Sequence, residues 1–303
     1  VTDKGEVECE VVVNCGGMFA PSIGRMVGVR IPIVPMSHQY MITENFLDPS
    51  PRRLPSLRDP DNLVYYRQQV GGLLMGGYEG NSQPWTASHT HVDDIPADFN
   101  SRLLDQDWDR FEEIDVNSQR RVPIMEKIGM KNFINGPEGF TPDNEFCLGE
   151  TEVGGFFVAA GFCAHGIAGA GGIGKVVAEW VVSGEPQMDL WHMDIRRFGA
   201  AYTSPSFTMK RVQENYESYY DIHYPGEERQ SARPLKTSPV YPWHRDADAV
   251  FGEKAGWERV NYYQSHATDD GLRPYGWAGK YWSSAIATEH HATRNSAGLF
   301  DES

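Results

Sequence analysis

The chain opens on a short alternation of apolar and acidic residues. Val7, Cys9 and Val11 alternate with three glutamates before the run Val11-Val12-Val13, and the pattern stops at Gly16-Gly17. This alternation predicts a strand that becomes increasingly buried and ends in a tight turn.

A short helix and further strands are predicted before residue 80. Pro21 begins the helix and Gly28 ends it. Strand character then follows in three segments, 30–43, 63–68 and 72–75, with a turn around Gly71 between the last two. We expect residues 30 to 80 to form an antiparallel sheet.

The next hundred residues predict a helix and then a strand–turn–helix unit. Apolar residues recur at helical spacing among acidic residues in 105–121. A buried strand at 156–160 runs into a glycine-rich turn, and the amphipathic helix after it ends at Gly184. Because α/β proteins present ligands in this order of elements, we predict an α/β fold with a mixed sheet.

The composition of the sequence changes after Pro186, where segments rich in Tyr, Trp, Pro and Arg replace the alternation of apolar and polar residues. The length of 303 residues suggests about two domains. We place boundaries near 188 and 245, which divides the chain into 1–188, 189–244 and 245–303.

Composition excludes some partners without naming a substrate. A formal net charge of −15 argues against nucleic acid or an anionic membrane surface as the main partner. No stretch of the sequence approaches the run of about 18 apolar residues that predicts a membrane span.

The cysteines and the paired histidines do not predict a metal site. Four scattered cysteines favour reduced, mostly buried thiols: Cys9, Cys15, Cys147 and Cys163. His89 and His91 precede Asp93-Asp94, but their spacing places both imidazoles on one face only in a strand, and this segment is typical of a polar loop. The pair His290-His291 is no stronger an indication of a metal site than His89 and His91.

The glycine-rich stretch 161–172 is a candidate ligand site. Backbone without side chains approaches a flat ligand closely, and the following helix begins with free N–H groups and a positive dipole. A reduced flavin, which is negative around N1 and the C2 carbonyl, suits such a helix start. The spacing alone is equally compatible with a turn of small residues that packs a helix on a sheet.

Several motifs together resemble dimethylglycine and sarcosine dehydrogenases. The resemblance rests on segments that span almost the whole chain: 12–20, 24–29, 32–44, 65–67, 135–143, 148–150, 184–198, 234–239, 251–259, 289–294 and 298–301. Of these, 184–198 resembles the linker to the family's small central domain. The segments from 234 onward resemble the start of its aminomethyltransferase-like folate domain.

The resemblance implies a fold and an activity. The fold is a truncated FAD-dependent oxidoreductase of the glutathione-reductase-like type, with an α+β substrate domain, followed by a small α+β central domain. The family oxidises an N-methyl amino acid by transferring hydride to FAD N5, and the one-carbon unit can pass to tetrahydrofolate. O2 or an electron-transfer flavoprotein would accept the electrons, in the bacterial cytoplasm or the mitochondrial matrix.

The resemblance also assigns site residues. His38 in His-Gln-Tyr and Tyr65 in Tyr-Tyr-Arg match the family's active-site pair. An imidazole and a phenol can hold an amino acid's amine and carboxylate, and the histidine suits a base near neutral pH. Simple strand packing is the alternative for both. The residues assigned to the cofactor are Gly16, Gly17, Tyr65, Pro142, Gly161, Phe162, Cys163, Ala164, His165, Gly166 and Ile167.

Two departures from the family pattern affect these expectations. Ala168 stands where related amine oxidases often carry a lysine, which puts carboxylate binding at that position in question. The chain begins with Val1 rather than Met, so we interpret it as starting inside a longer protein, with the family's GxGxxG and flavin-tethering histidine upstream. We therefore expect residues 1–303 alone not to bind FAD tightly, and to expose apolar surface where the remainder docks.

Two other classes of function remain open on the sequence. One is a non-catalytic regulatory paralogue that resembles the pyruvate dehydrogenase phosphatase regulatory subunit. The other is a folate-dependent aminomethyltransferase, which only the C-terminal segment supports. The presence of both His38 and Tyr65 favours an enzyme.

Overall fold

A computed structural model describes residues 3–48, 53–85, 94–268 and 273–301. The chain divides into two compact units, Val1–Asp221 and Ile222–Ser303, and each is described by itself. The three-domain division at 188 and 245 stays a prediction.

The larger sheet of the first unit has five antiparallel strands in the order β3-β4-β5-β2-β6. The strands are β2 (Val34–Thr43), β3 (Leu57–Asp59), β4 (Val64–Gln69), β5 (Gly72–Gly77) and β6 (Met130–Phe140). The predicted antiparallel sheet within 30–80 is confirmed. The long strand β6 was not predicted; it pairs with nearly all of β2.

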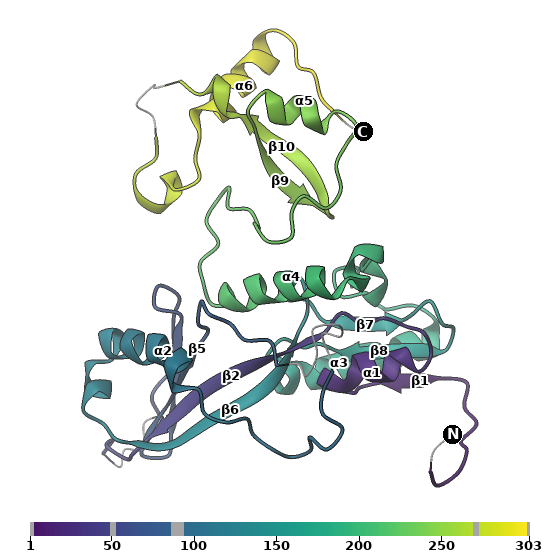
Figure 1. Cartoon of the computed structure of the whole chain (residues 1–303), viewed down its shortest axis with the longest axis vertical. Helices are drawn as coiled ribbons and strands as arrows, with labels where there is room; N and C mark the ends of the chain where they lie inside the picture. The colour runs from purple at the N-terminus through teal and green to yellow at the C-terminus, as the bar shows by residue number, and fades with distance from the viewer. Residues whose placement is uncertain (1–2, 49–52, 86–93, 269–272, 302–303) are drawn as a thin grey trace. The chain divides into compact units, whose positions relative to one another are not determined.

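Alternating side chains give this sheet two different faces. On one face, Met41, Tyr66, Met75 and Phe133 form a core cluster with apolar residues of α2 (Trp108–Arg121), which Figure 1 shows beside the sheet. The predicted helix is therefore confirmed. Its N-cap is Asp107, whose side chain accepts a hydrogen bond from the N–H of Arg110.

The smaller sheet joins β1 (Val12–Asn14), β8 (Phe156–Ala160) and β7 (Cys147–Glu150), with β1 parallel and β7 antiparallel to β8. This confirms the predicted mixed sheet. The first strand is shorter than predicted, and burial increases along the segment as predicted, from Val7 at 77% exposed to Asn14 at 2%. Val12 and Val13 are 46% and 41% exposed, because β1 is an edge strand of the described sheet, and only Asn14 is buried.

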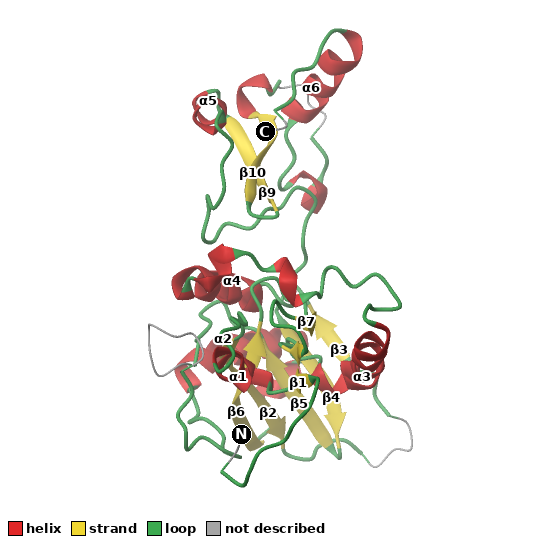
Figure 2. Cartoon of the chain, turned by 90° about the vertical axis from the view of Figure 1, so that its right-hand side faces the viewer, coloured by secondary structure: helices red, strands yellow, loops and turns green. Residues whose placement is uncertain are grey.

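Helices α1 and α3 flank the smaller sheet (Figure 2). After η1 (Gly17–Phe19), α1 (Ala20–Arg25) carries Pro21 in its first turn, as predicted. Helix α3 (Gly166–Ser183) buries Ile173, Val177 and Trp180 and ends at Gly184 with a φ of 80°. The predicted glycine stop is therefore confirmed.

The close approach of α3 to β7 requires a glycine at position 149. Gly149 has a φ of +97°, and a Cβ at this position would overlap the ring of Trp180. We expect Gly149→Ala to lower the free energy of unfolding by roughly 1–3 kcal/mol, because overpacking adds to backbone strain. Urea unfolding measures the loss. Gly172→Ala is the control, since apart from its chain neighbours and the nearby backbone of its own helix no atom lies within 4 Å of its Cβ position; an equal effect of the two changes would contradict the prediction.

The remaining elements are mostly helical. The first unit continues with η2 (Pro123–Glu126), η3 (Ile195–Arg197), η4 (Ala200–Thr203) and α4 (Pro205–Glu217). The second unit contains α5 (Tyr241–Asp246), the antiparallel pair β9 (Ala249–Lys254) and β10 (Trp257–Tyr263), η5 (Gln264–His266), η6 (Gly276–Gly279) and α6 (Ser284–Asn295). Within the described ranges, no helix has the length and apolar character needed to cross a membrane.

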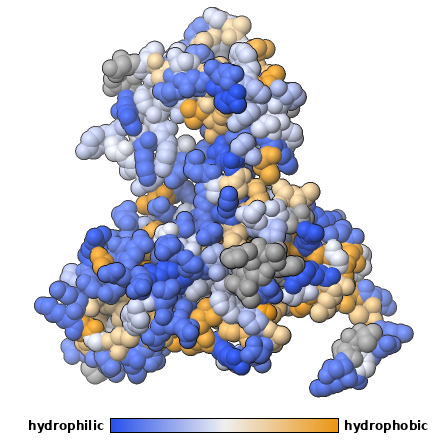
Figure 3. All heavy atoms as spheres, viewed as in Figure 1, coloured by the Kyte–Doolittle hydropathy of each residue, from blue (hydrophilic) through white to orange (hydrophobic). Residues whose placement is uncertain are grey.

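Apolar surface is exposed along α3 and β1. Ile167 and Val182 are 100% and 85% exposed, and Val13 and Val182 line an open groove of about 610 Å³ with other small and apolar residues. Figure 3 shows apolar residues at the surface among hydrophilic ones. That a further part of the protein docks on this groove stays a prediction.

The burial of the cysteines differs from the expectation. All four thiols are free, but only Cys147 and Cys163 are buried, while Cys9 and Cys15 are exposed. The latter two lie in the irregular N-terminal segment and just after the edge strand β1, where little packs on them.

Candidate active site

The second face of the five-stranded sheet brings His38 and Tyr65 together. His38 lies on β2 and Tyr65 on β4, and β5 runs between them. Gly76 of β5 lies directly opposite both Tyr40 and Tyr65, and a Cβ at Gly76 would overlap the Tyr65 hydroxyl. The missing side chain therefore lets the phenol reach across the strand, and its Oη lies 3.1 Å from His38 Nε2.

Burial sets the protonation of this pair. His38 is 5% exposed, and burial lowers the pKa of its imidazole below the usual 6.5; Arg110 acts in the same direction, while Glu138 opposes it. Burial also raises the pKa of the Tyr65 phenol far above 10. At neutral pH the pair is therefore a neutral imidazole beside a protonated phenol, one group that can accept a proton and one that can donate a hydrogen bond.

Aromatic rings and one carboxylate surround the pair. The ring of Tyr78 lies 4.7 Å from that of His38, and the ring of Tyr220 lies 5.6 Å from that of Tyr65. Glu138 is on β6, and because His38 pairs with Gly136, its side chain is on the same face of the sheet. Its Oε2 is buried without a hydrogen-bond partner in the described part of the chain. Tyrosine faces and a free carboxylate favour a cationic ligand.

The loop from Gly161 to His165 connects β8 to α3. Gly161 has a φ of +69°, and Cys163 and Ala164 have φ values of 42° and 65°, which is unusual for residues with side chains. The Cys163 N–H donates to the carbonyl of Gly139 at 3.3 Å, and the Thr141 N–H lies 3.4 Å from Cys163 Sγ. The predicted neighbour Pro142 is therefore held beside this loop.

The residues of this loop and of the α3 start fit a flat, anionic ring edge. Ala164 and Ile167 are exposed at the beginning of α3, whose first N–H groups have no partner within the helix. Gly169 is the first residue of the helix whose N–H bonds to a preceding carbonyl, that of His165. Residues Gly161 to Ile167 would thus hold the edge of an isoalloxazine ring through backbone groups.

The other predicted cofactor residues include Gly16 and Gly17. Gly17 lines the groove beside α3 together with Phe162 of the loop. Gly16 is packed near Ile23 and Asn14, and a Cβ there would lie 2.7 Å from Ile23 Cδ1. Ala168, at the position where related amine oxidases often carry a lysine, is exposed in the first turn of α3.

Several residues around the site were missed by the sequence reasoning. They are Tyr78, Glu79, Arg110, Glu138, Tyr216 and Tyr219. Tyr219 donates to the carbonyl of Cys163 at 2.5 Å and lies 2.7 Å from His165 Nδ1. The spacing of Tyr216, Tyr219 and Tyr220 at the end of an amphipathic helix was a usable signal, and Glu138 lies within one of the motifs that resemble the family.

The structure describes only one of the two histidine pairs. His89 and His91 lie outside the described residues, and His290 and His291 are exposed on α6. In the part of the chain that the structure describes, no group of three or more His, Cys, Asp or Glu residues could hold a metal ion.

Comparison with known proteins identifies the family. Residues 1–180 match the model of the FAD dependent oxidoreductase family, 183–238 that of the FAD dependent oxidoreductase central domain, and 240–303 that of the GCVT N-terminal domain. The chain therefore belongs to the FAD dependent oxidoreductase family, and its mixed α/β fold is the fold of that family. It is similar to dimethylglycine and sarcosine dehydrogenases, as the sequence predicted.

The relatives are longer than this chain. Mitochondrial sarcosine dehydrogenase of Mus musculus is 35% identical over 286 residues, 94% of this chain and 30% of the relative. Mitochondrial dimethylglycine dehydrogenase of Rattus norvegicus is 31% identical over 304 residues, which are 99% of this chain and 35% of the relative. The mitochondrial pyruvate dehydrogenase phosphatase regulatory subunit of Mus musculus is 36% identical over 265 residues, 86% and 30%. The chain thus spans about a third of the length of these relatives.

A solved structure supports the fold. L-proline dehydrogenase from P. horikoshii matches with a TM-score of 0.53 and 24% identity, covering 65% of this chain and 49% of that one.

Proposed function

We propose that the full-length protein oxidises the N-methyl group of a small amino acid, dimethylglycine or sarcosine. The observation that carries the proposal is the pair of His38 and Tyr65, a neutral imidazole and a protonated phenol whose facing atoms are 3.1 Å apart. Dimethylglycine and sarcosine dehydrogenases among the relatives support the substrate class.

The side chains around the pair would have different roles toward such a substrate. An N-methyl amino acid carries an ammonium proton that must leave before hydride transfer, and His38 Nε2 accepts it. The Tyr65 hydroxyl faces Nε2 in the site without substrate, and it would turn its single proton to the substrate carboxylate, which frees the Nε2 lone pair. Arg67, two residues further on β4 and on the same face, adds a positive charge near Tyr65. The Glu138 carboxylate and the tyrosine rings attract the ammonium group.

FAD would supply the hydride acceptor. The backbone of Gly161 to Ile167 would hold the ring edge, and the other predicted residues, Gly16, Gly17 and Pro142, would lie around it. The one-carbon unit would pass to tetrahydrofolate bound with the help of the GCVT-type domain, whose matched part begins at residue 240. O2 or an electron-transfer flavoprotein would reoxidise the flavin, in the bacterial cytoplasm or the mitochondrial matrix.

Anaerobic bleaching of the flavin tests this function. We expect the full-length protein to show a flavin absorption band that dimethylglycine or sarcosine bleaches without O2. Glycine, which has no N-methyl group, is the control and should leave the band unchanged. A flavin band that neither amine bleaches would contradict the proposal.

A regulatory role is the second candidate. The observation that favours it is the 36% identity to the pyruvate dehydrogenase phosphatase regulatory subunit over 86% of this chain. In that case the protein would bind a partner enzyme and would not turn over N-methyl amino acids, so the same bleaching experiment separates the two functions.

A further inference from the structure

The second ring nitrogen of His38 has a partner that comes from a distant part of the chain. The hydroxyl of Tyr216, in the last turn of α4, lies 2.9 Å from His38 Nδ1, across a separation of 178 residues. Tyr216 is completely buried. The segment matched as the central domain thus contributes a contact to the proposed base of the oxidoreductase domain.

The surroundings of the Tyr216 hydroxyl decide where its proton points. Its Oη lies 3.2 Å from the carbonyl oxygen of Ser37 and 3.4 Å from Glu79 Oε2. A carbonyl and a carboxylate only accept hydrogen bonds, and burial raises the pKa of Tyr216 well above 10, so the phenol keeps one proton to donate. When that proton goes to either oxygen, the Tyr216 oxygen accepts from His38 Nδ1–H.

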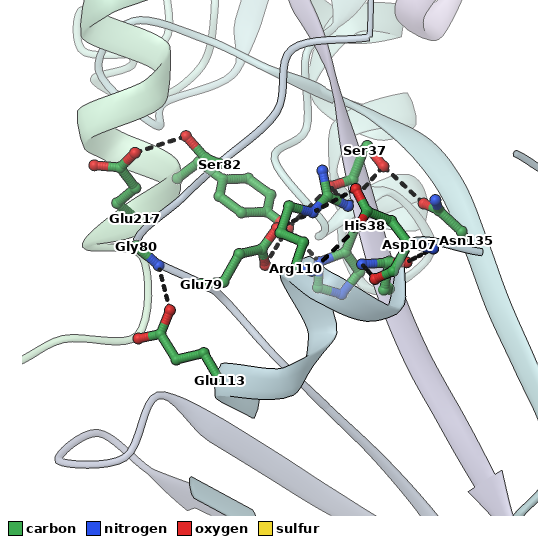
Figure 4. A network of polar contacts seen from close by, with 12 residues as sticks. Ser37, His38, Glu79, Gly80, Ser82, Asp107, Arg110, Glu113, Asn135 and Glu217 are labelled. Carbon is green, nitrogen blue, oxygen red and sulfur yellow. Dashed lines mark hydrogen bonds and ion pairs between the residues drawn. The ribbon is translucent and has the colours of Figure 1, made fainter. Parts of the chain in front are cut away.

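Glu79 and the residues that follow it are held in place by three contacts (Figure 4). Its Oε1 lies 2.9 Å from Arg110 Nε, and both side chains are almost fully buried. The next residues along the chain are tied as well: the Gly80 N–H donates to Glu113 of α2, and the Ser82 hydroxyl donates to Glu217 of α4. The acceptor facing Tyr216 therefore has a fixed position between two helices. Burial raises the pKa of Glu79 to about 7, so it is ionised and an acceptor at pH 8.

The same helix end also holds the proposed cofactor loop. Asn215 donates to the carbonyls of Thr141 and Pro142, and Tyr219 donates to the carbonyl of Cys163. Residues 215–219 thus bind backbone at two places beside the α3 start while Tyr216 binds the imidazole. This independent set of contacts gives α4 one defined position at the site.

We propose that Tyr216 is a positioning residue that holds His38 as the Nδ1–H tautomer, with Glu79 and the Ser37 carbonyl directing the phenol proton away from the imidazole. In the site without substrate, the unprotonated Nε2 then faces the Tyr65 hydroxyl at 3.1 Å and accepts its hydrogen bond. This inference rests on the proposed function, because it gives the nitrogen on the substrate side the lone pair that accepts the ammonium proton.

The groups that act on the titration of His38 come from every element packed around it. They are Tyr65 from β4, Tyr78 and Glu79 after β5, Arg110 from α2, Glu138 from β6 and Tyr216 from α4.

Two measurements on Tyr216→Phe in the full-length protein test the proposal. The first is solid-state NMR of ¹⁵N-histidine-labelled protein at pH 8, with the His38 signals assigned by their loss in His38→Ala. We expect wild type to show a protonated Nδ1 and an unprotonated Nε2, and Tyr216→Phe to show a mixture of tautomers. The second is anaerobic flavin reduction over a pH series. We expect the rate to fall about 10- to 100-fold, as it does when the partner that orients a metal-bound histidine is removed, with a shifted pH profile and little change in KM.

Tyr66→Phe is the matched control. Tyr66 is also a buried tyrosine that donates to a main-chain carbonyl, that of Ser118, but on the opposite face of the sheet. It should leave the His38 signals and the pH profile unchanged. A wild-type His38 with its proton on Nε2, or a Tyr216→Phe protein with unchanged tautomer and profile, would overturn the proposal. If no amine reduces the wild-type flavin, the proposed function fails, while the NMR measurement still decides the tautomer.

Discussion

Replacement of His38 by alanine is expected to slow flavin reduction in the full-length protein by about 10²- to 10⁴-fold, the usual contribution of a general base. The reason is that the amine lone pair must be free before hydride leaves, and no other group beside Tyr65 is both neutral and basic near pH 7 in the described part of the site. Stopped-flow reduction under anaerobic conditions measures the rate.

The pH dependence of the flavin-reduction rate tests the role of His38 more specifically than the rate at one pH. Burial lowers the pKa of His38, so the neutral imidazole persists below pH 6.5, and the wild-type rate should decline only below that pH. In His38→Ala this decline should disappear. His192→Ala is a suitable control, because His192 is exposed and its ring stacks on that of Trp191. A His38→Ala protein with the wild-type rate and profile would show that His38 is structural.

Replacement of Arg110 by methionine is expected to give the largest loss of stability. The guanidinium and the Glu79 carboxylate form an ion pair at 2.9 Å with side chains 3% and 0% exposed. Removal of one partner of a buried pair costs about 3–5 kcal/mol, because the other charge is left uncompensated. Urea unfolding measures the change. Arg102→Met is the control: its pair with Asp98 is exposed, so its loss should cost at most about 1 kcal/mol.

This loss should depend on pH in a defined direction. Burial raises the pKa of Glu79 from 4.5 to about 7, and Arg110 opposes the rise. A carboxyl whose pKa is raised on folding contributes stability below its unfolded pKa and loses it as the pH rises through the folded pKa. Without Arg110 the folded pKa rises further, so the free energy of unfolding of both proteins should fall alike up to about pH 7, and only that of Arg110→Met should keep falling above it. Parallel curves above pH 7 would contradict this account.

The sequence predicted the elements whose patterns are local. Alternation and turn residues placed β4 and β5, and a terminal glycine placed the end of α3. It did not predict β6, because Asn-Gly-Pro-Glu-Gly at 135–139 lacks the β-branched residues typical of strands, and pairing with β2 overrides that weak propensity.

The candidate site was predictable only in part. His38 and Tyr65 were found through a family resemblance, and the structure brings them within hydrogen-bond distance, while their catalytic roles stay a prediction. Tyr216 and the pair of Glu79 with Arg110 depend on how α4 and α2 pack on the ends of the strands. Contacts across 178 and 31 residues leave no periodic signal in the sequence.

The contact of Tyr216 with His38 has a consequence for how such proteins can evolve. A gene rearrangement that joined the oxidoreductase region, matched up to residue 180, to an unrelated partner would keep His38 and Tyr65 but lose the hydroxyl beside Nδ1. It would also lose the side chains that fasten the 139–165 backbone, Asn215 and Tyr219. The two regions are therefore expected to be inherited as a single unit, and substitutions at 38, 79 and 216 to accompany one another among descendants.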